Sequence, residues 1–398
     1  MSSLAKRPPR SGAGTPYLLL ITPGTDKFAD EERGVVDACA AKGLRTLTVY
    51  SDKDAIASGR GETLSPAKVL TPGDHCWVML KWVLELFKGL RWWVSRDGKA
   101  RSLFVAAIPG IRDYWSNVAF SRRVVAAHGR PRALLTLEPW SSTSLTIVDW
   151  MKTKGVLTAG TRTQTTMDRD EHAVINTDIL FAKSTWEEDL YRRVLGERGP
   201  ALQRGCILSL PPAPPLEPLA LPGEFVLVLG TARQYSQDDR DYRDLRDTLG
   251  RVASTYDLPV VLKAHPAERL DGDRTGTRDP GRGASLLVTD VTRNRELIDR
   301  ASLVVSAPST LLYQAILSET PVVIVEADPE GSPDDEFHSS PIARISRGAP
   351  AEIHLPHWED LRASARKART WFEENYFLDK GAAFIIDYLV EYPDVRGS

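Results

Sequence analysis

Short apolar runs alternate along the chain with segments whose apolar residues recur every three or four positions. The first pattern is typical of buried parallel strands, and the second is typical of helices that cover a sheet. Because the two patterns alternate, we predict an α/β fold with parallel sheets between layers of helices. In the first half, strands are predicted at 17–21, 45–50, 102–106, 133–137, 156–159, 179–182 and 206–208, with helices at 30–42, 113–128 and 142–154.

A proline-rich segment separates the two halves of the chain. Residues 211–223, PPAPPLEPLALPG, contain six prolines in thirteen positions. Proline fixes φ and donates no backbone hydrogen bond, so this segment is excluded from helices and inner strands. A chain of 398 residues is also longer than one ordinary domain. The predicted organisation is a disordered tail (1–15), a first α/β domain (16–210), the linker (211–223), a second α/β domain (224–380) and a C-terminal helix (381–398) able to cross back onto the first domain.

The second half carries small and polar residues where its predicted strands end. Strands at 225–230, 259–263, 286–289, 303–306 and 321–326 are predicted to alternate with helices at 237–256, 293–300 and 309–318. In an open α/β sheet, ligands bind outside the carboxyl ends of the strands. We therefore predict that a nucleotide binds at these ends, around Gly230, Thr231, Arg233, Lys263, His265, Pro266, Ser309, Thr310 and Glu326.

Ser309 and Thr310 are the strongest of these candidates for binding a phosphate. We expect Pro308 to occupy the first turn of a helix, where its missing N–H costs nothing. The free N–H groups of that turn and the positive end of the helix dipole favour an anion. The alternative is that Ser306 or Ser309 only caps the helix, as such residues commonly do.

His265 is the candidate for direct chemistry on the donor side. Pro266 restricts the backbone next to it, so the direction of the imidazole is set. An imidazole there could bind the phosphate or the base and assist the leaving group. Lys263 ends an apolar strand, and we expect its charge to reach water or an anion. The alternative for His265 is an ordinary core or loop histidine.

The stretch Lys263-Ala264-His265-Pro266, a variable loop, then Val304–Thr310 (VVSAPST) and Pro321–Val323 resembles the donor domain of bacterial capsule and lipopolysaccharide glycosyltransferases. That group includes sialyl- and polysialyltransferases, capsule Kdo (3-deoxy-manno-octulosonic acid) transferases and the glycerol-phosphate polymerases of wall teichoic acid. Its members share an HP motif and a Ser-Ser/Thr motif that bind the nucleotide of the donor. The resemblance covers about residues 224–330 and depends on both motifs together.

The resemblance implies a GT-B fold, in which two Rossmann-like, doubly wound domains face a central cleft. It also implies transfer of a CMP-activated acidic sugar, such as sialic acid or Kdo, to a glycan or glycolipid acceptor in surface polysaccharide synthesis. Such enzymes need no metal for catalysis and no further cofactor. Within the same fold, transfer of a polyol phosphate from a CDP-polyol and 2-epimerisation of a UDP-sugar are alternatives.

The first half offers a candidate for the catalytic base. The sialyltransferase-like members carry an acidic pair followed by glycine, but the similar stretch here, Asp30–Gly34, is expected inside a helix, so the role is not carried over. Glu138 is the better candidate, because it ends a predicted strand and would face the cleft. Its alternative role is to cap the helix that follows. Asp26 and Arg162, each in a loop after a strand, are weaker candidates for the acceptor side.

Residues 76–94, CWVMLKWVLELFKGLRWWV, predict a helix with unusual polarity. Lys81, Glu85, Lys88 and Arg91 are spaced by four, three and three, so they share one face. Apolar residues, including four of the ten tryptophans, fill the remainder. Such a helix could lie in a bilayer interface through its tryptophans and basic residues. The alternative is a helix that packs on the first sheet.

Composition narrows the function classes. The formal net charge is −2, which is not the basic excess of a nucleic-acid-binding domain. The three cysteines are far apart and lack the spacing of metal ligands, and no signal peptide is recognisable. We therefore expect a cytoplasmic protein, which could act at the inner face of the cytoplasmic membrane. No GxGxxG follows a strand, which argues against a dinucleotide oxidoreductase. A noncatalytic nucleotide-binding subunit of a polysaccharide assembly complex is the alternative outside enzymes.

Overall fold

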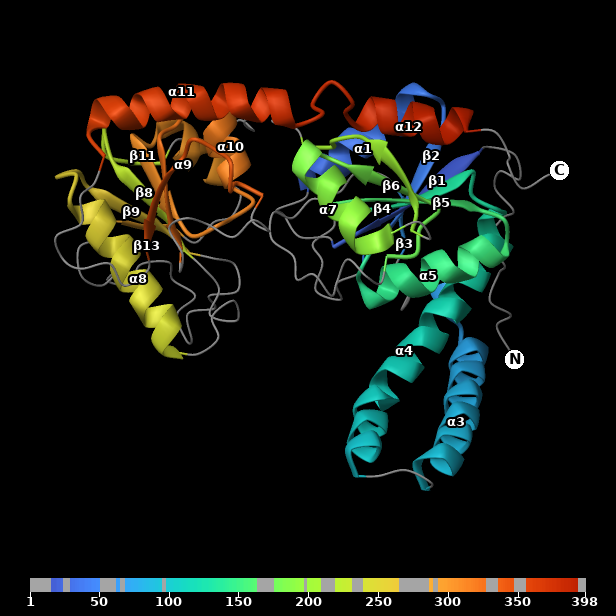
Figure 1. Cartoon of the computed structure of the whole chain (residues 1–398). Coiled ribbons are helices and arrows are strands. Elements are labelled where there is room, and N and C mark those ends of the chain that lie inside the picture. Colours follow the sequence, from blue (N-terminus) through green and yellow to red (C-terminus); the bar gives the residue numbers. More distant parts are fainter. Residues whose placement is uncertain are drawn as a thin grey trace, which may run out of the picture.

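Two parallel β-sheets, each covered by helices, make up the chain (Figure 1). The computed structural model describes residues 16–23, 29–50, 62–64, 69–94, 98–162, 175–196, 199–208, 219–230, 239–264, 286–288, 293–326, 336–346 and 356–392. Within these residues every paired strand of both sheets is parallel, in agreement with the predicted α/β class.

The first sheet has seven strands in the order β3-β2-β1-β4-β5-β6-β7. Its inner strand β1 is buried on both faces, as a parallel strand between helical layers must be. Leu18 and Leu20 contribute to the core on one face, and Leu19 and Ile21 contribute to the core on the other. The strands are β1 (Tyr17–Thr22), β2 (Arg45–Tyr50), β3 (Glu62–Leu64), β4 (Ala133–Thr136), β5 (Leu157–Thr161), β6 (Ile179–Ala182) and β7 (Ala201–Arg204).

The second sheet has six strands in the order β10-β9-β8-β11-β12-β13. In sequence terms this is the 3-2-1-4-5-6 order of a doubly wound fold that binds nucleotides. The strands are β8 (Val226–Leu229), β9 (Val260–Lys263), β10 (Leu286–Val288), β11 (Leu303–Ser306), β12 (Val322–Glu326) and β13 (Ala343–Ser346).

Helices cover both faces of each sheet. On the first sheet, α1 (Ala29–Ala41) lies on one face, and α5 (Ser142–Thr153) with the end of α4 (Gly98–His128) lies on the other. On the second sheet, α8 (Asp239–Ser254) covers one face, and α9 (Asn294–Arg300) and α10 (Leu312–Leu317) cover the other. The remaining helices are α3 (Pro72–Val94), α7 (Thr185–Leu195), α11 (Trp358–Asn375) and α12 (Ala382–Glu391).

The chain returns from the second domain to the first through its last two helices (Figure 1). Helix α11 packs on the second domain, and α12 packs against α1 with Ile385, Ile386 and Leu389 in the core of the first domain. An ion pair at 2.7 Å joins Lys42 Nζ to Asp387 Oδ1 at this contact. The C-terminal helix is therefore part of the first domain's core.

Two predicted strands were wrong. Residues 102–106 lie inside helix α4 and not in a sheet. Short apolar runs of this kind fit either structure, and the helical periodicity of the residues that follow decided the outcome. Residues 206–208 are not a strand either, because the edge strand is β7 and the buried Cys206 donates its N–H to the carbonyl of Lys380 at 2.9 Å. Burial against the returning chain explains the apolar character of that run.

Two domains meet through charged side chains that are fully buried. Lys183, directly after β6, places its Nζ 3.2 Å from Glu336 Oε2 of the second domain, and neither side chain is exposed at all. Glu336 also accepts hydrogen bonds from the hydroxyls of Tyr313 (2.6 Å) and Tyr376 (2.7 Å). On the first-domain side, Glu187 accepts the N–H of Lys183 at 2.7 Å. We call Arg162, Lys183, Glu187, Tyr191, Tyr313, Glu336 and Tyr376 the interdomain cluster.

Burial and partner charges oppose each other within the interdomain cluster. Burial lowers the pKa of Lys183, although Glu336 and Glu187 act against this. Burial likewise raises the pKa of Glu187 against the pull of Lys183 and Arg162. Burial and then the charge of Glu336 raise the pKa of Tyr313 and Tyr376 well above the usual value, so both phenols stay neutral donors. The charged members are stable only together, because any of them left alone would be an uncompensated buried charge.

We expect Glu336→Gln to destabilise the protein strongly. The substitution keeps the shape but leaves Lys183 buried without its charge partner, which typically costs about 3–5 kcal/mol of unfolding free energy. The double variant Lys183→Met/Glu336→Gln removes both charges and should recover a large part of the loss. Urea unfolding followed by fluorescence measures both.

The matched control is Glu373→Gln, which removes the exposed ion pair with Arg369 (2.8 Å). Exposed pairs contribute about 0.2–1 kcal/mol, so its unfolding midpoint should stay close to that of the native protein. If Glu336→Gln behaves like Glu373→Gln, the interdomain cluster does not stabilise the molecule.

Candidate functional site

In each sheet the strand order reverses at one point, and polar residues lie at the carboxyl ends of the two strands that meet there. In the second sheet the reversal lies between β8 and β11. Gly230 follows β8, and the segment Ser306–Thr310 continues from the end of β11. In the first sheet it lies between β1 and β4, which end at Thr22 and at Leu137–Glu138. Ligands of doubly wound sheets bind at this position.

The segment after β11 differs from the prediction in one respect. Helix α10 begins at Leu312, so Pro308 is not in its first turn, and the N-terminal residue has no side-chain cap. Ser309–Leu311 form a tight turn instead, in which the N–H groups of Leu312 and Tyr313 bond to the carbonyls of Ser309 and Thr310. The turn is of the 3₁₀ type that commonly opens a helix, and it keeps the hydroxyls of Ser309 and Thr310 partly exposed.

The serines of this segment make only local bonds. Ser309 Oγ accepts the N–H of Leu311 at 3.4 Å, and Ser306 Oγ donates to the carbonyl of Ala307 at 2.6 Å. Ser309 is thus a turn residue rather than the cap of a regular helix. Tyr313, one turn further on, belongs to the interdomain cluster through its hydrogen bond to Glu336. This bond fixes the position of the segment.

Lys263 does not extend into solvent, which was one of the two environments expected for its charge. Its side chain is 3% exposed, and Nζ donates to the carbonyl of Ala264 at 2.9 Å. The strand end turns the ammonium back onto the backbone, because the carbonyl there replaces part of its hydration. Gly230, at the end of the neighbouring strand, donates its N–H to the carbonyl of Lys263 at 2.7 Å.

Glu326 ends β12 and is held by the next strand. Arg344 of β13 forms a short ion pair with its Oε1, and both side chains are largely buried. The structure thus brings Gly230, Lys263, Ser309, Thr310 and Glu326 to the carboxyl edge of one sheet. Five other candidates, Asp26, Thr231, Arg233, His265 and Pro266, lie outside the described residues.

Glu138 lies at the reversal point of the first sheet, two residues after β4. Its N–H donates to Thr136 Oγ1 at 3.2 Å, and its side chain is partly exposed. The N-cap of α5 is Ser141, whose Oγ accepts the N–H of Ser144 at 3.2 Å. Ser141 thus occupies the cap position that was the alternative role of Glu138.

Arg162 is a buried structural residue in this structure. It follows β5, is not exposed at all, and its Nη1 lies 3.5 Å from Glu187 Oε1. Burial opposes the charge, but Glu187 and Glu336 outweigh it and raise the pKa of Arg162. Its Nε and Nη2 have no hydrogen-bond partner among the described residues. The guanidinium belongs to the interdomain cluster, which the sequence did not reveal.

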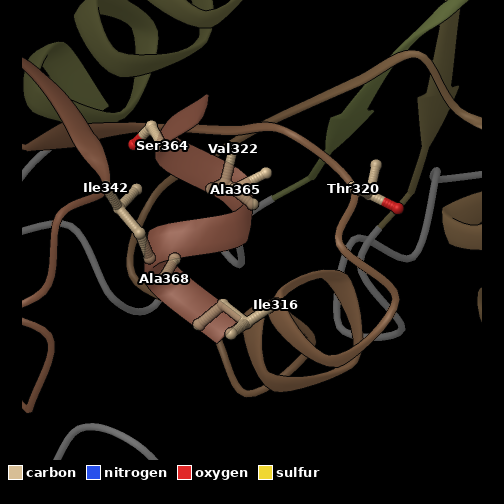
Figure 2. Close-up of a pocket in the computed structure, with 7 residues that line it drawn as sticks. All are labelled: Ile316, Thr320, Val322, Ile342, Ser364, Ala365 and Ala368. Atoms are coloured by element: carbon tan, nitrogen blue, oxygen red, sulfur yellow. The ribbon is translucent and has the colours of Figure 1, made fainter. Parts of the chain in front are cut away.

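A small hollow in the second domain lies at the opposite edge of the sheet (Figure 2). Thr320 and Val322 line it where β12 begins, and Ile342 lines it just before β13. The hollow is mostly apolar and therefore lacks the groups that bind a nucleotide. It is not part of the candidate site.

Comparison with known proteins gives the fold but no sequence family. No family model matches the chain, and no curated protein sequence matches it. Among solved structures, the glycosyltransferase SnogD from Streptomyces nogalater matches with a TM-score of 0.52 and 13% identity, over 95% of this chain and 100% of that one. A UDP-glucosyltransferase from Polygonum tinctorium matches with 0.53 and 10% identity, over 96% and 100%.

An equally good match is a UDP-N-acetylglucosamine 2-epimerase. The structure from Listeria monocytogenes, described as such a putative enzyme, has a TM-score of 0.54 and 12% identity, over 94% of this chain and 95% of that one. All three matches extend over nearly the whole of both chains. The chain has a GT-B fold. At these identities the likeness establishes the fold alone.

Proposed function

We propose that this GT-B protein is a glycosyltransferase that moves a sugar from a nucleotide donor to a glycan or lipid-linked acceptor. One observation carries the proposal: both domains have polar residues at the reversal point of their sheets. A donor against the second domain and an acceptor against the first would each occupy the position where doubly wound sheets bind ligands. The GT-B fold of the whole chain supports the same division of roles.

The donor phosphate is proposed to bind at Ser309–Thr310. Both residues are partly exposed, and their hydroxyls can donate hydrogen bonds to a phosphate. Gly230 on the neighbouring strand has no side chain to obstruct a ligand. His265 is proposed to contact the nucleotide and assist the leaving group, as its position in the KAHP motif suggests.

A finer proposal concerns the identity of the donor. The motif pair at Lys263–Pro266 and Ser309–Thr310 resembles that of transferases using cytidine-activated sugars, so we propose a CMP-linked acidic sugar. The acceptor would then be a growing surface polysaccharide or its lipid-linked precursor. Glu138 is proposed as the base or as a ligand of the acceptor, because it occupies the corresponding position in the first domain.

Epimerisation of a UDP-sugar is the second candidate. The likeness to UDP-N-acetylglucosamine 2-epimerases, with TM-scores of 0.54, favours it as much as the other matches favour transfer. The two reactions differ in their need for an acceptor. Incubation of the protein with a UDP-sugar alone, followed by analysis for the 2-epimer, distinguishes them, and epimer formed without acceptor would overturn the transferase proposal.

The donor proposal predicts stabilisation by a nucleotide. A ligand at a hundred times its dissociation constant should stabilise the protein by about 2.7 kcal/mol, which raises the melting temperature by several degrees. A thermal-shift series with CMP, CDP, UMP, UDP and GDP should show the largest shift with a cytidine nucleotide. A larger shift with UDP would overturn the cytidine assignment but would still support a nucleotide site.

Ser309→Ala/Thr310→Val should reduce that nucleotide's affinity about tenfold, since each hydroxyl hydrogen bond contributes about 0.5–1.5 kcal/mol. Thr370→Val, on the exposed side of α11, makes the same chemical change away from the site and is the control. Equal nucleotide affinity in the two variants would remove Ser309 and Thr310 from the donor site.

Glu138→Gln tests the acceptor side. The substitution is nearly isosteric and removes only the charge, so the turnover rate should fall about 10²–10⁴-fold if Glu138 is the base. Nucleotide affinity should not change, because the residue belongs to the other domain. Glu138→Asp, which keeps the carboxylate, should retain more activity than Glu138→Gln. A loss of tenfold or less in Glu138→Gln would return the residue to a structural role.

A further inference from the structure

Helices α3 and α4 form a hairpin that projects from the first domain (Figure 1). The two helices pack on each other, and α4 packs on α5 only near its C-terminal end, where Phe120 and Val124 enter the core. At the base, Asp74 accepts bonds from Thr71 and from Arg123 Nε of α4 at 2.7 Å. Despite its partial burial, these bonds lower the pKa of Asp74 to about 2. The two helices are therefore joined at the base of the hairpin at neutral pH.

Lys81, the first residue of the predicted charged stripe on α3, packs toward the partner helix. Lys81 Nζ lies 5.2 Å from the ring of Trp115 on α4 and 5.7 Å from the ring of Trp77. Trp77 and Trp115 meet edge to face at 5.5 Å. Lys81 and Trp77, two of the residues predicted to contact a bilayer, therefore pack toward α4. The alternative prediction, that this helix packs on the first sheet, is wrong, because α3 packs on α4.

The opposite face of α3 is apolar and exposed. Met79, Leu80, Val83, Leu84 and Phe87 recur with helical spacing, and their exposed fractions lie between 37% and 64%. They are all but one of the large hydrophobic side chains that are exposed in the described part of the chain. A contiguous apolar face of this kind marks an interaction surface, because exposure to water is unfavourable.

The sequence of the two helices carries a basic excess, which favours an anionic partner. Beyond Glu85, α3 contains Lys88 and Arg91 but no acidic residue, and α4 up to Asp113 contains Lys99, Arg101 and Arg112 but no acidic residue. The chain as a whole is slightly acidic, so the basic excess is local to the hairpin. Lysine and arginine beside an apolar face attract anionic lipid headgroups.

We propose that the apolar face of α3 inserts into the surface of an anionic phospholipid bilayer, with the hairpin as the membrane anchor of the first domain. No described helix is both long and apolar enough to span a membrane, so the contact is interfacial. A second copy of the chain is a poorer occupant, because two such hairpins would bring like charges together. The proposal concerns binding and holds whether or not the chain transfers sugars.

Vesicle flotation of the full-length protein tests the proposal. Vesicles of phosphatidylcholine mixed with phosphatidylglycerol should bind the protein, phosphatidylcholine alone should bind it weakly, and high salt should reduce the binding. Leu80→Gln/Leu84→Gln/Phe87→Gln should raise the apparent dissociation constant for the mixed vesicles about tenfold or more. Glutamine is a good helix former and these positions are exposed, so melting temperature and helix content should stay unchanged.

The matched control keeps the same positions apolar. Leu80→Met/Leu84→Met/Phe87→Leu should bind vesicles like the native protein. Native protein that does not float with the mixed vesicles, or a glutamine variant that floats equally well, would overturn the proposal. Sedimentation that shows a native dimer and a monomeric glutamine variant would also overturn it and assign the face to self-association. Nucleotide-induced thermal shifts should be the same in all three proteins, which separates this result from the donor proposal.

Discussion

Two opposite charges from different domains, Lys183 and Glu336, meet where no solvent reaches them. Burial of this contact costs free energy, because each charge loses its hydration and only the attraction of its partner offsets that loss. Tyr313 and Tyr376 complete the set by donating to both carboxylate oxygens of Glu336. The pair therefore fixes how the end of strand β6 lies against the second domain. The antiparallel bridge between Ser184 and Tyr376 extends the same contact along the backbone.

The interdomain cluster also reaches the proposed donor site. Tyr313 belongs to α10, the helix that follows Ser309 and Thr310, so its bond to Glu336 holds that helix against the first domain. A rotation of one domain about this point would have to separate buried charges or carry α10 with it. Domain motion during a reaction would therefore be coupled to the strand end where the donor is proposed to bind.

The sequence predicted local elements well and long-range contacts poorly. Strands β1, β8 and β11 are continuous apolar runs that are buried on both faces, as predicted. Residues 102–106 carry an equally apolar run, which a helix accommodates as easily as a strand. Lys183 and Glu336 have no sequence pattern in common, because their pairing depends on how two domains dock. The polarity of α3 shows the same limit. The spacing of its residues predicted a charged face, but only the position of α4 determines which face is covered.

The hairpin and the proposed acceptor site belong to one rigid connection. Helix α4 leads through a short turn into β4, and β4 ends two residues before Glu138 at the reversal point of the first sheet. The end of α4 is packed in the core by Phe120 and Val124, so its direction relative to β4 is fixed. A bilayer bound to α3 would thus have a set orientation relative to Glu138, while the donor side belongs to the other domain. This arrangement would suit an acceptor that remains attached to a membrane and a donor that arrives from solution.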